Sequence, residues 1–467
     1  MSTLDRLRQL VRPAGPAPSQ PPAPPRELTY EQLDRHGNPM PERRDLPPLD
    51  GASIIDTPAG PCIVIDRTFE PHSSHGRLAV EEAEVSVSDV VAFCEKDRAA
   101  LMGSRWREGL GRNEPDDAPA HASIDDAAPV IFLDLETTGL SGGAGTVAFL
   151  VGCGYFKDGA FHTRQFFLTG FAAERAMLHA VTTLLSEAAC LVTYNGKTFD
   201  VPVMETRWLF HRVPPPWTEL THLDMVHVSR RLWRARNDIG DAGCRLVMLE
   251  HDLFGVIRHG DVPGFEIPAR YFGYIRGGEA EMLEPVLHHN RLDLLSLAFL
   301  TARALRLLRE GAPGAHDPQE CLALGRELVR LRDDARADAC FRAAAESPFA
   351  SASVRAEALY ALARHLRRAR RYHEAAMVWR RLVSCNAPRD VLNSEAREAL
   401  AVHYEHRDRD LDAAHEWATD AYRTESDTRR RDAFAHRLAR LKRKMAVHTK
   451  GGPQTAFEWE FSLGLDE

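Results

Sequence analysis

Residues 130–139 read VIFLDLETTG, and this stretch decides how the central part of the chain folds. The apolar run Val130–Leu133 predicts a short buried strand. Asp134 and Glu136 follow it, and alternate residues of a strand point to the same face. Two carboxylates about 4 Å apart repel by roughly 4 kcal/mol at an effective dielectric near 20. The pair therefore indicates a place where solvent, protonation or a cation relieves this repulsion, although an ordinary solvated strand end also fits.

A second acidic motif follows the next strand signal. Residues 194–202 read YNGKTFDVP, so a strand over Leu191–Tyr194 ends in a glycine-containing loop and Asp200 opens a helix. In the simplest interpretation, Asp200 satisfies free backbone N–H groups at the start of that helix. In the other, it joins the two acids of the first strand.

A third acidic motif lies in residues 288–293, HHNRLD. On a helix, His289 and Asp293 are four residues apart and share a face. They could form a surface pair contributing a few tenths of a kcal/mol. The apolar residues 294, 295 and 297 instead indicate a largely buried helix. A buried, ionised aspartate needs a partner or a metal.

Strand and helix signals alternate between residues 129 and 310, which predicts an α/β domain. Further strands are expected near 149–153, 166–168 and 222–228, with a hairpin turn at Lys157-Asp158-Gly159. Helices are expected near 173–188, 201–211 and 284–309.

Before this domain, residues 51–128 predict a small β-rich preface and a linker. Its strands, Ser53–Ile55 and Cys62–Ile65, bracket the turn Pro58-Ala59-Gly60-Pro61. The prolines within residues 1–50 favour an extended, disordered segment. Residues 446–467 form a C-terminal tail.

An internal repeat of 38 residues runs through residues 315–445. Leu324, Leu328, Ala337 and Phe341 are followed at this interval by Leu362, Leu366, Ala375 and Trp379, and then by Leu400, Tyr404, Ala413 and Trp417. Each unit predicts two helices crossing at the alanine. The pattern resembles tetratricopeptide repeats, whose unit is 34 residues. An irregular helical bundle is the alternative.

Composition limits the class of protein. With 44% hydrophobic and 27% charged residues, the chain is typical of a soluble protein with a core. Its apolar stretches are too short to span a membrane. A net charge of −8 argues against a chain-wide basic coat. The 8 cysteines contain no CxxC pair, which fits a reducing cytoplasm.

Taken together, the three acidic motifs resemble those of the DEDD exonuclease superfamily in order and spacing. The run Thr137–Gly143, continued by Ala148–Gly152, resembles more closely the YprB-like ribonuclease H-like family, as do Asp261–Gly264 and Arg270–Phe272. That family pairs this domain with tetratricopeptide-like repeats. The resemblance covers about residues 51–440. It implies a ribonuclease H-like fold with a mixed sheet flanked by helices, followed by an all-α repeat domain.

The resemblance also implies a set of site residues. Asp134, Glu136, Asp200 and Asp293 would bind two Mg²⁺ or Mn²⁺ ions, which prefer oxygen ligands. The general base would be His289, with His288 as the alternative. Thr137, Asn195 and Phe199 would contact nucleic acid. Asn195 could instead only tie its loop, and Phe199 could equally fill the core.

We therefore expect a metal-dependent nuclease, acting as a 3′–5′ exonuclease on single-stranded DNA or RNA ends. The alternatives are a ribonuclease H-like module that binds nucleic acid without turnover, and a structural adaptor in which the repeats dominate. In each case the repeats are expected to recruit a protein partner.

Overall fold

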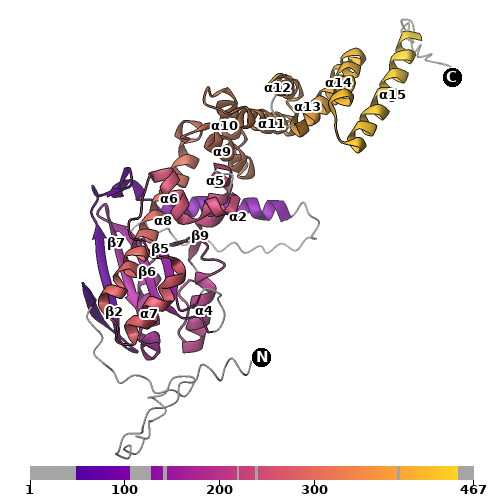
Figure 1. Ribbon diagram of the computed structural model, residues 1–467. Helices are drawn as coiled ribbons and strands as arrows, with labels where there is room; N and C mark the ends of the chain where they lie inside the picture. Colours follow the sequence, from indigo (N-terminus) through magenta and orange to yellow (C-terminus); the bar gives the residue numbers. More distant parts are fainter. Residues whose placement is uncertain are drawn as a thin grey trace, which may run out of the picture.

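The computed structural model describes residues 49–105, 128–139, 145–217, 220–236, 240–385 and 390–450. Figure 1 shows an α/β body from which a row of helices extends as an arm. Nearly all of the Pro-rich segment 1–50, most of the predicted linker and most of the tail 446–467 lie outside the described residues. Those predictions, like the domain boundaries, stay predictions.

The body is built on a sheet of 7 strands in the order β1-β2-β7-β6-β5-β8-β9. Strands β5, β6 and β7 are antiparallel neighbours, whereas β8 runs parallel to β5 and β9 runs parallel to β8. The strands are β1 (Ala52–Thr57), β2 (Gly60–Phe69), β5 (Val130–Thr137), β6 (Ala148–Lys157), β7 (Ala160–Phe167), β8 (Cys190–Thr193) and β9 (Thr221–Asp224). A two-stranded hairpin, β3 (Ser74–His75) with β4 (Leu78–Ala79), lies outside this sheet.

The strands expected before the central domain form, and they join its sheet. β2 pairs antiparallel with β7, from Ile63 opposite Phe167 to Phe69 opposite Phe161. The hairpin turn between β6 and β7 also forms where it was expected. Asp158 and Gly159 both have positive φ, at 54° and 77°, as a tight two-residue hairpin turn requires.

Helices cover both faces of this sheet, which confirms the predicted mixed α/β class. The helices of the body are α2 (Val87–Arg105), α3 (Glu174–Ser186), α4 (Asp200–His211), α5 (Met225–Trp233), α6 (Leu246–Phe254), α7 (Ile267–Ile275) and α8 (Glu284–Glu310). The prediction of a strand over 222–228 is wrong in its second half. The strand stops at Asp224, whose side chain accepts the Val226 N–H and starts α5.

Alternate residues of β5 face two different parts of the core. Val130 and Phe132 pack in a cluster that includes the buried leucines of α8, whereas Ile131, Leu133 and Leu135 pack on the other face. Asp134 and Glu136 continue the row of Val130 and Phe132. The two acids therefore emerge on the face that α8 covers.

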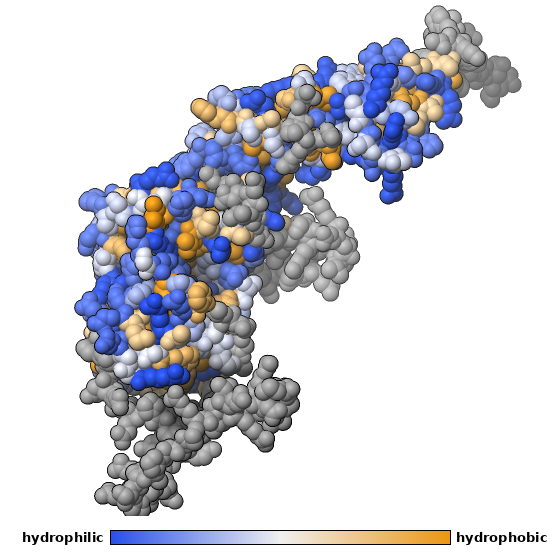
Figure 2. Space-filling view, viewed as in Figure 1, coloured by the Kyte–Doolittle hydropathy of each residue, from blue (hydrophilic) through white to orange (hydrophobic). Residues whose placement is uncertain are grey.

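The arm consists of helices that pack mainly on their sequence neighbours, which confirms the predicted all-helical C-terminal region. They are α9 (Pro318–Arg330), α10 (Asp334–Glu346), α11 (Ala352–Arg368), α12 (Tyr372–Ser384), α13 (Asp390–His403), α14 (Leu411–Thr424) and α15 (Thr428–Lys450). The visible face of the arm is mostly hydrophilic, with scattered hydrophobic residues (Figure 2). The likeness to tetratricopeptide repeats stays a prediction.

The 38-residue pattern holds through the second unit and then slips by one residue. Left-handed arginines end the first helix of each pair, at Arg332, Arg370 and Arg409. The last interval is one residue longer because a π-helical turn, η10 (Tyr404–Asp408), follows α13. Ala414 and Ala418 of α14 are consequently buried, whereas Ala413 and Trp417, expected there, are only half-buried.

The body and the arm share α8 and a buried ionic contact. The second half of α8 packs in the same apolar cluster as Leu322 and Leu324 of α9. Glu320, which is fully buried, accepts hydrogen bonds from Trp233 Nε1 at 2.8 Å and from Arg303. The arm is therefore seated directly on the helix that carries Asp293.

All 8 cysteines carry free thiols and are buried or half-buried. No helix among the residues described here is both long enough and apolar enough to cross a membrane.

We predict that Gly152→Ala destabilises the body. A Cβ at Gly152 would lie 2.1 Å from Asn290 Oδ1 on α8, so the buried Asn290 side chain must leave its bonds to Gln165 and Asp134, or the helix must shift. Overpacking of this kind costs about 1–3 kcal/mol, which urea unfolding will measure. Gly264→Ala is the matched control, because its Cβ would meet nothing within 4 Å. Equal unfolding midpoints for the two variants would contradict the close approach of α8 to β6.

Candidate carboxylate site

Acidic side chains collect at one edge of the sheet because three parallel strands end there. β5, β8 and β9 are adjacent and parallel, with Leu133 opposite Thr193 and Thr193 opposite Asp224. Asp134 and Glu136 therefore lie at the end of β5, Asp200 follows β8 and Asp224 ends β9. The carboxyl ends of parallel strands are where α/β sheets bind ligands.

Helix α8 brings Asp293, the last of the four predicted acids, to this edge. Asn290 is fully buried, and its Nδ2 donates to Asp134 Oδ2 at 2.8 Å. Its Oδ1 accepts from Gln165 Nε2 of β7 at 2.8 Å, and Gln165 also donates to the Leu287 carbonyl. These bonds fix α8 against the sheet. Asp293, one turn after Asn290, consequently lies over the end of β5.

The electrostatics show that the four acids lie close together. Burial raises the pKa of Asp134 well above its usual range, and the negative charges of Asp293 and Asp200 raise it further. The pKa of Glu136 is raised by burial and then by Asp134, Asp293 and Asp200. Burial, with the charge of Asp224, raises the pKa of Asp200 to about 7. Burial and the neighbouring acids therefore disfavour ionisation of Asp134 and Glu136. Burial and Asp224 disfavour ionisation of Asp200, as expected of a site that needs positive charge.

The loop before Asp200 is held by Asp224. The two carboxylate oxygens of Asp224 accept the backbone N–H groups of Asn195 and Lys197, at 2.8 and 3.0 Å. Asn195 adopts a left-handed conformation with φ of 66°, and its Oδ1 accepts from the Thr198 hydroxyl. Asp224 thus acts on this loop through the backbone, and the loop sets where α4 begins.

The expected nucleic-acid contacts differ in exposure. Asn195 is exposed, and Phe199 is half-buried immediately before Asp200. Thr137 is buried, and its hydroxyl donates to the Gly139 carbonyl at 2.8 Å. Thr137 therefore shapes the turn after β5.

Of the two candidate bases, His289 lies among the acids and His288 is exposed. His289 Nδ1 is 2.7 Å from Asp261 Oδ1, and its Nε2 is 3.6 Å from Asp293 Oδ2. Asp261 belongs to the loop between α6 and α7, so a third segment orients the imidazole. For His288, partial burial and the charge of Arg291 lower the pKa.

A buried arginine connects this site to the core. Arg258 donates to both oxygens of Glu250, at 2.6 and 2.8 Å, and to Asp293 Oδ1 at 2.5 Å. Glu250 also accepts from the Ser296 hydroxyl, which in turn contacts His75 Nε2 at 2.8 Å. Because Arg258 carries a fixed positive charge beside Asp293, it partly offsets the charge of the carboxylates.

The donor set suits a hard divalent cation. Carboxylate oxygens are the ligands that Mg²⁺ and Mn²⁺ prefer, and the mutual repulsion of these acids is relieved by a cation. In this structure the four carboxylates are not yet close enough to share one ion. Any three of them fail to place one oxygen each within 4.8 Å of the other two. Asp293 is bonded to Arg258, so a cation shared by Asp293 and Asp134 requires the Asp293 side chain to move.

Sequence reasoning did not assign roles to Asp261, Glu250 or Arg258. Asp261 stood within one of the family-like motifs, which was the available signal. Glu250 and Arg258 gave none, because a glutamate and an arginine eight residues apart resemble any surface pair. Only the fold shows that both are buried.

We predict that Asp200 makes the stability of the metal-free protein depend on pH. Its pKa rises from 3.8 to about 7 on folding, so the folded state favours the protonated form. This contribution is complete below pH about 4 and is lost as the pH rises through about 7, by up to roughly 4 kcal/mol. Asp200→Asn cannot titrate and therefore lacks this pH-dependent contribution. In urea unfolding with EDTA, the stability of the natural protein relative to Asp200→Asn should therefore fall between pH 4 and 7.

The matched control is Asp158→Asn, at an exposed hairpin turn far from the other acids in sequence. Its stability relative to the natural protein should not change over this range. A pH-independent difference for Asp200→Asn would show that Asp200 is ionised normally in the fold.

Comparisons with known proteins agree with this geometry. Residues 131–305 match the family model of the RNase H superfamily, and this range contains all four carboxylates and His289. The chain is 31% identical over 330 residues to the uncharacterized protein YprB of Bacillus subtilis (strain 168). That alignment covers 68% of this chain and 75% of YprB. The chain therefore belongs to the RNase H superfamily, in the same family as YprB.

Proposed function

We propose that this protein is a divalent-metal-dependent nuclease of the DEDD type that removes nucleotides in the 3′–5′ direction from single-stranded DNA or RNA. Membership of the RNase H superfamily indicates a nuclease, and such nucleases typically use divalent metal ions. The observation that carries the proposal is the gathering of Asp134, Glu136, Asp200 and Asp293, from three separate segments, around one edge of the sheet.

The four carboxylates are the proposed ligands of two Mg²⁺ or Mn²⁺ ions. Asp134, Glu136 and Asp293 would hold one ion, Asp134 would also reach the second, and Asp200 would act at the second ion or through water. When bound, such ions lower the pKa of water and stabilise charge on the leaving oxygen. The raised carboxylate pKa values make this site most receptive to cations once the acids are ionised, near and above neutral pH.

His289 is the proposed acceptor of the proton from the attacking water. If Nδ1–H donates to Asp261, the lone pair is placed on Nε2, which faces Asp293 and the other acids. Asp261 then orients the ring and stabilises its protonated form, as the aspartate does in hydrolytic triads. His288 remains the alternative base, and its exposure weighs against it.

The residues beside Asp200 are the proposed substrate contacts. Phe199 is half-buried beside Asp200, and we propose that its ring stacks on a terminal base, an interaction of about 1–3 kcal/mol. Asn195 lies exposed on the same loop. The Thr137 hydroxyl is already bonded to a carbonyl, so we assign Thr137 an indirect part, through the shape of the turn after β5. The arm would bring a protein partner to the same molecule.

We predict that Asp134→Asn and Asp293→Asn abolish release of nucleotides. Full-length protein is incubated with single-stranded DNA and RNA, labelled at either end, with Mg²⁺ or Mn²⁺. The natural protein should shorten a 5′-labelled strand stepwise and release a labelled mononucleotide at once from a 3′-labelled strand. Each variant should lose roughly 10²- to 10³-fold in rate, the scale of losing one charge-stabilising group.

Asp158→Asn serves as the control, because it removes a carboxylate from an exposed turn outside the site and should keep full activity. Absence of cleavage with every metal and strand would contradict the nuclease. Retained binding without cleavage would favour a nucleic-acid-binding module instead. Release from the 5′ end first would overturn the polarity alone.

We predict that His289→Ala slows cleavage roughly 10²- to 10⁴-fold, the usual contribution of a general base. The measurement is kcat as a function of pH. In the natural protein kcat should fall at low pH, where the base is protonated, and loss of the base should remove this fall. The same profile for His288→Ala distinguishes the candidates. If the fall in kcat at low pH disappears in His288→Ala and remains in His289→Ala, His288 is the base instead.

A further inference from the structure

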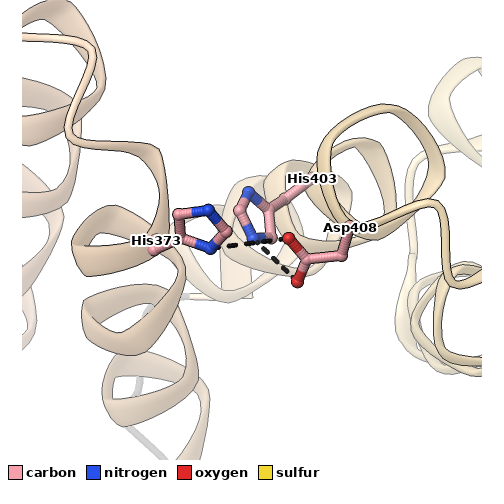
Figure 3. Close-up of side chains that lie close together, drawn as sticks. All are labelled: His373, His403 and Asp408. Atoms are coloured by element: carbon pink, nitrogen blue, oxygen red, sulfur yellow. Dashed lines mark ion pairs between the residues drawn. The ribbon is translucent and has the colours of Figure 1, made fainter.

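A second group of metal-ligating side chains lies in the arm, far along the chain from the carboxylates. His373 belongs to the first turn of α12, His403 ends α13 and Asp408 ends the π-helical turn η10. Figure 3 shows both imidazole rings directed at the Asp408 carboxylate, from opposite sides of the gap between α12 and the turn. One ligand atom from each residue lies within 4.8 Å of the other two.

The spacing of these atoms suits one small cation. His373 Nδ1 is 3.5 Å from Asp408 Oδ1, and His403 Nε2 is 3.2 Å from Asp408 Oδ2. Two ligands at about 2.0–2.1 Å from a tetrahedral zinc ion lie roughly 3.3 Å apart. The two ring planes are nearly perpendicular, at 89°. The ring centroids are 5.3 Å apart, so the two imidazoles lie side by side without overlapping.

The π-turn is what brings Asp408 to His403. The two residues are five apart in sequence. In a continuous α-helix with 3.6 residues per turn, they would lie on different sides. The π-helix, with its i to i+5 hydrogen bonds, places them one above the other. The one-residue insertion that interrupts the 38-residue pattern thus creates the cluster, and such π-turns often mark functional sites.

His403 is the most enclosed of the three ligands. Its side chain is only 7% exposed, and its Nε2 lies 3.2 Å from Asp408 Oδ2. A ring nitrogen buried to this extent needs a polar partner or a cation. Nε2 is also the atom that faces the other two ligands (Figure 3).

We propose that His373, His403 and Asp408 bind one zinc ion. Two imidazoles and one carboxylate favour zinc over Mg²⁺, which prefers oxygen ligands alone. Three protein ligands leave the fourth position of a tetrahedral ion free. His373 is 81% exposed, so that position opens to solvent and is filled by water or by a ligand from a partner.

The ionic groups around the three ligands are mostly basic. The guanidinium groups of Arg407 and Arg380 stack on Tyr372 at 4.0 Å and Tyr404 at 5.5 Å and keep their positive charge. Glu405, in the same turn, pairs with Arg437, Arg440 and Lys444 of α15. Asp408 supplies the negative charge of the site. Zinc would therefore tie α12 to the turn after α13 and fix the angle between the second and third helix pairs.

The test measures zinc binding to the full chain, with a colorimetric zinc chelator as the competitor. Asp134→Asn and Asp293→Asn are introduced throughout, so that the carboxylate site contributes no tight zinc binding. This background should bind one zinc ion per chain. Adding His373→Gln should weaken binding at least about 100-fold, the upper range for loss of even an indirect partner of a metal ligand. Because His373 is exposed, this variant should keep the fold.

His406→Gln is the matched control, because it removes a histidine of the same turn that faces Glu405 instead of the cluster. It should bind zinc like the background. Cobalt in place of zinc should give visible absorption bands of a four-coordinate ion, which Asp408→Asn should abolish. The proposal is overturned if the background binds no zinc, or if His373→Gln and Asp408→Asn bind it unchanged. Neither result bears on the nuclease, since the carboxylate site is disabled in every sample.

Discussion

The gathering of four buried or half-buried carboxylates at one edge of the sheet is the constraint on which the rest of this structure depends. Burial and the neighbouring charges raise the pKa of Asp134, Glu136 and Asp200 together. The fold holds them in place through Asn290 on Asp134, Asp224 on the loop before Asp200, and Arg258 on Asp293. A protein gains nothing in stability from such a cluster, so a cation site is its simplest explanation.

Helix α8 makes the site and the arm parts of one unit. Its first half carries His289, Asn290 and Asp293, and its second half packs in the apolar cluster that continues into α9 and α11. The Glu320 contacts with Trp233 and Arg303 reinforce this junction. A partner bound to the arm would therefore be held at a fixed orientation relative to the sheet edge.

The parts predictable from sequence were those set by local spacing. The alternation of Asp134 and Glu136 on β5, the apolar face of α8 and the turn at Asp158-Gly159 each follow from a few neighbouring residues. The pairing of β2 with β7 could not be read from the chain, because residues about 100 positions apart decide it. Asp224 lies within the strand expected near 222–228, but its hydrogen bonds to the loop of Asn195 depend on the fold.

The arm shows the same limit. A constant period predicted its helices, yet the single-residue insertion at η10 was invisible because Ala413 and Ala414 are both alanines, so either register looked acceptable. The buried Arg258 and Glu250 pair was missed for a related reason: ion pairs reveal their burial only once the elements around them are packed.

The most direct test of the central claim is a crystal structure of the full chain grown with Mn²⁺ and a short single strand bearing an uncleavable terminal linkage. Anomalous scattering locates the manganese ions independently of the fold. The account predicts two ions between Asp134, Glu136, Asp200 and Asp293, with Asp293 moved from Arg258 towards them and the scissile phosphate beside His289. Manganese bound only elsewhere, with Asp293 still paired to Arg258 at saturating concentration, would contradict it.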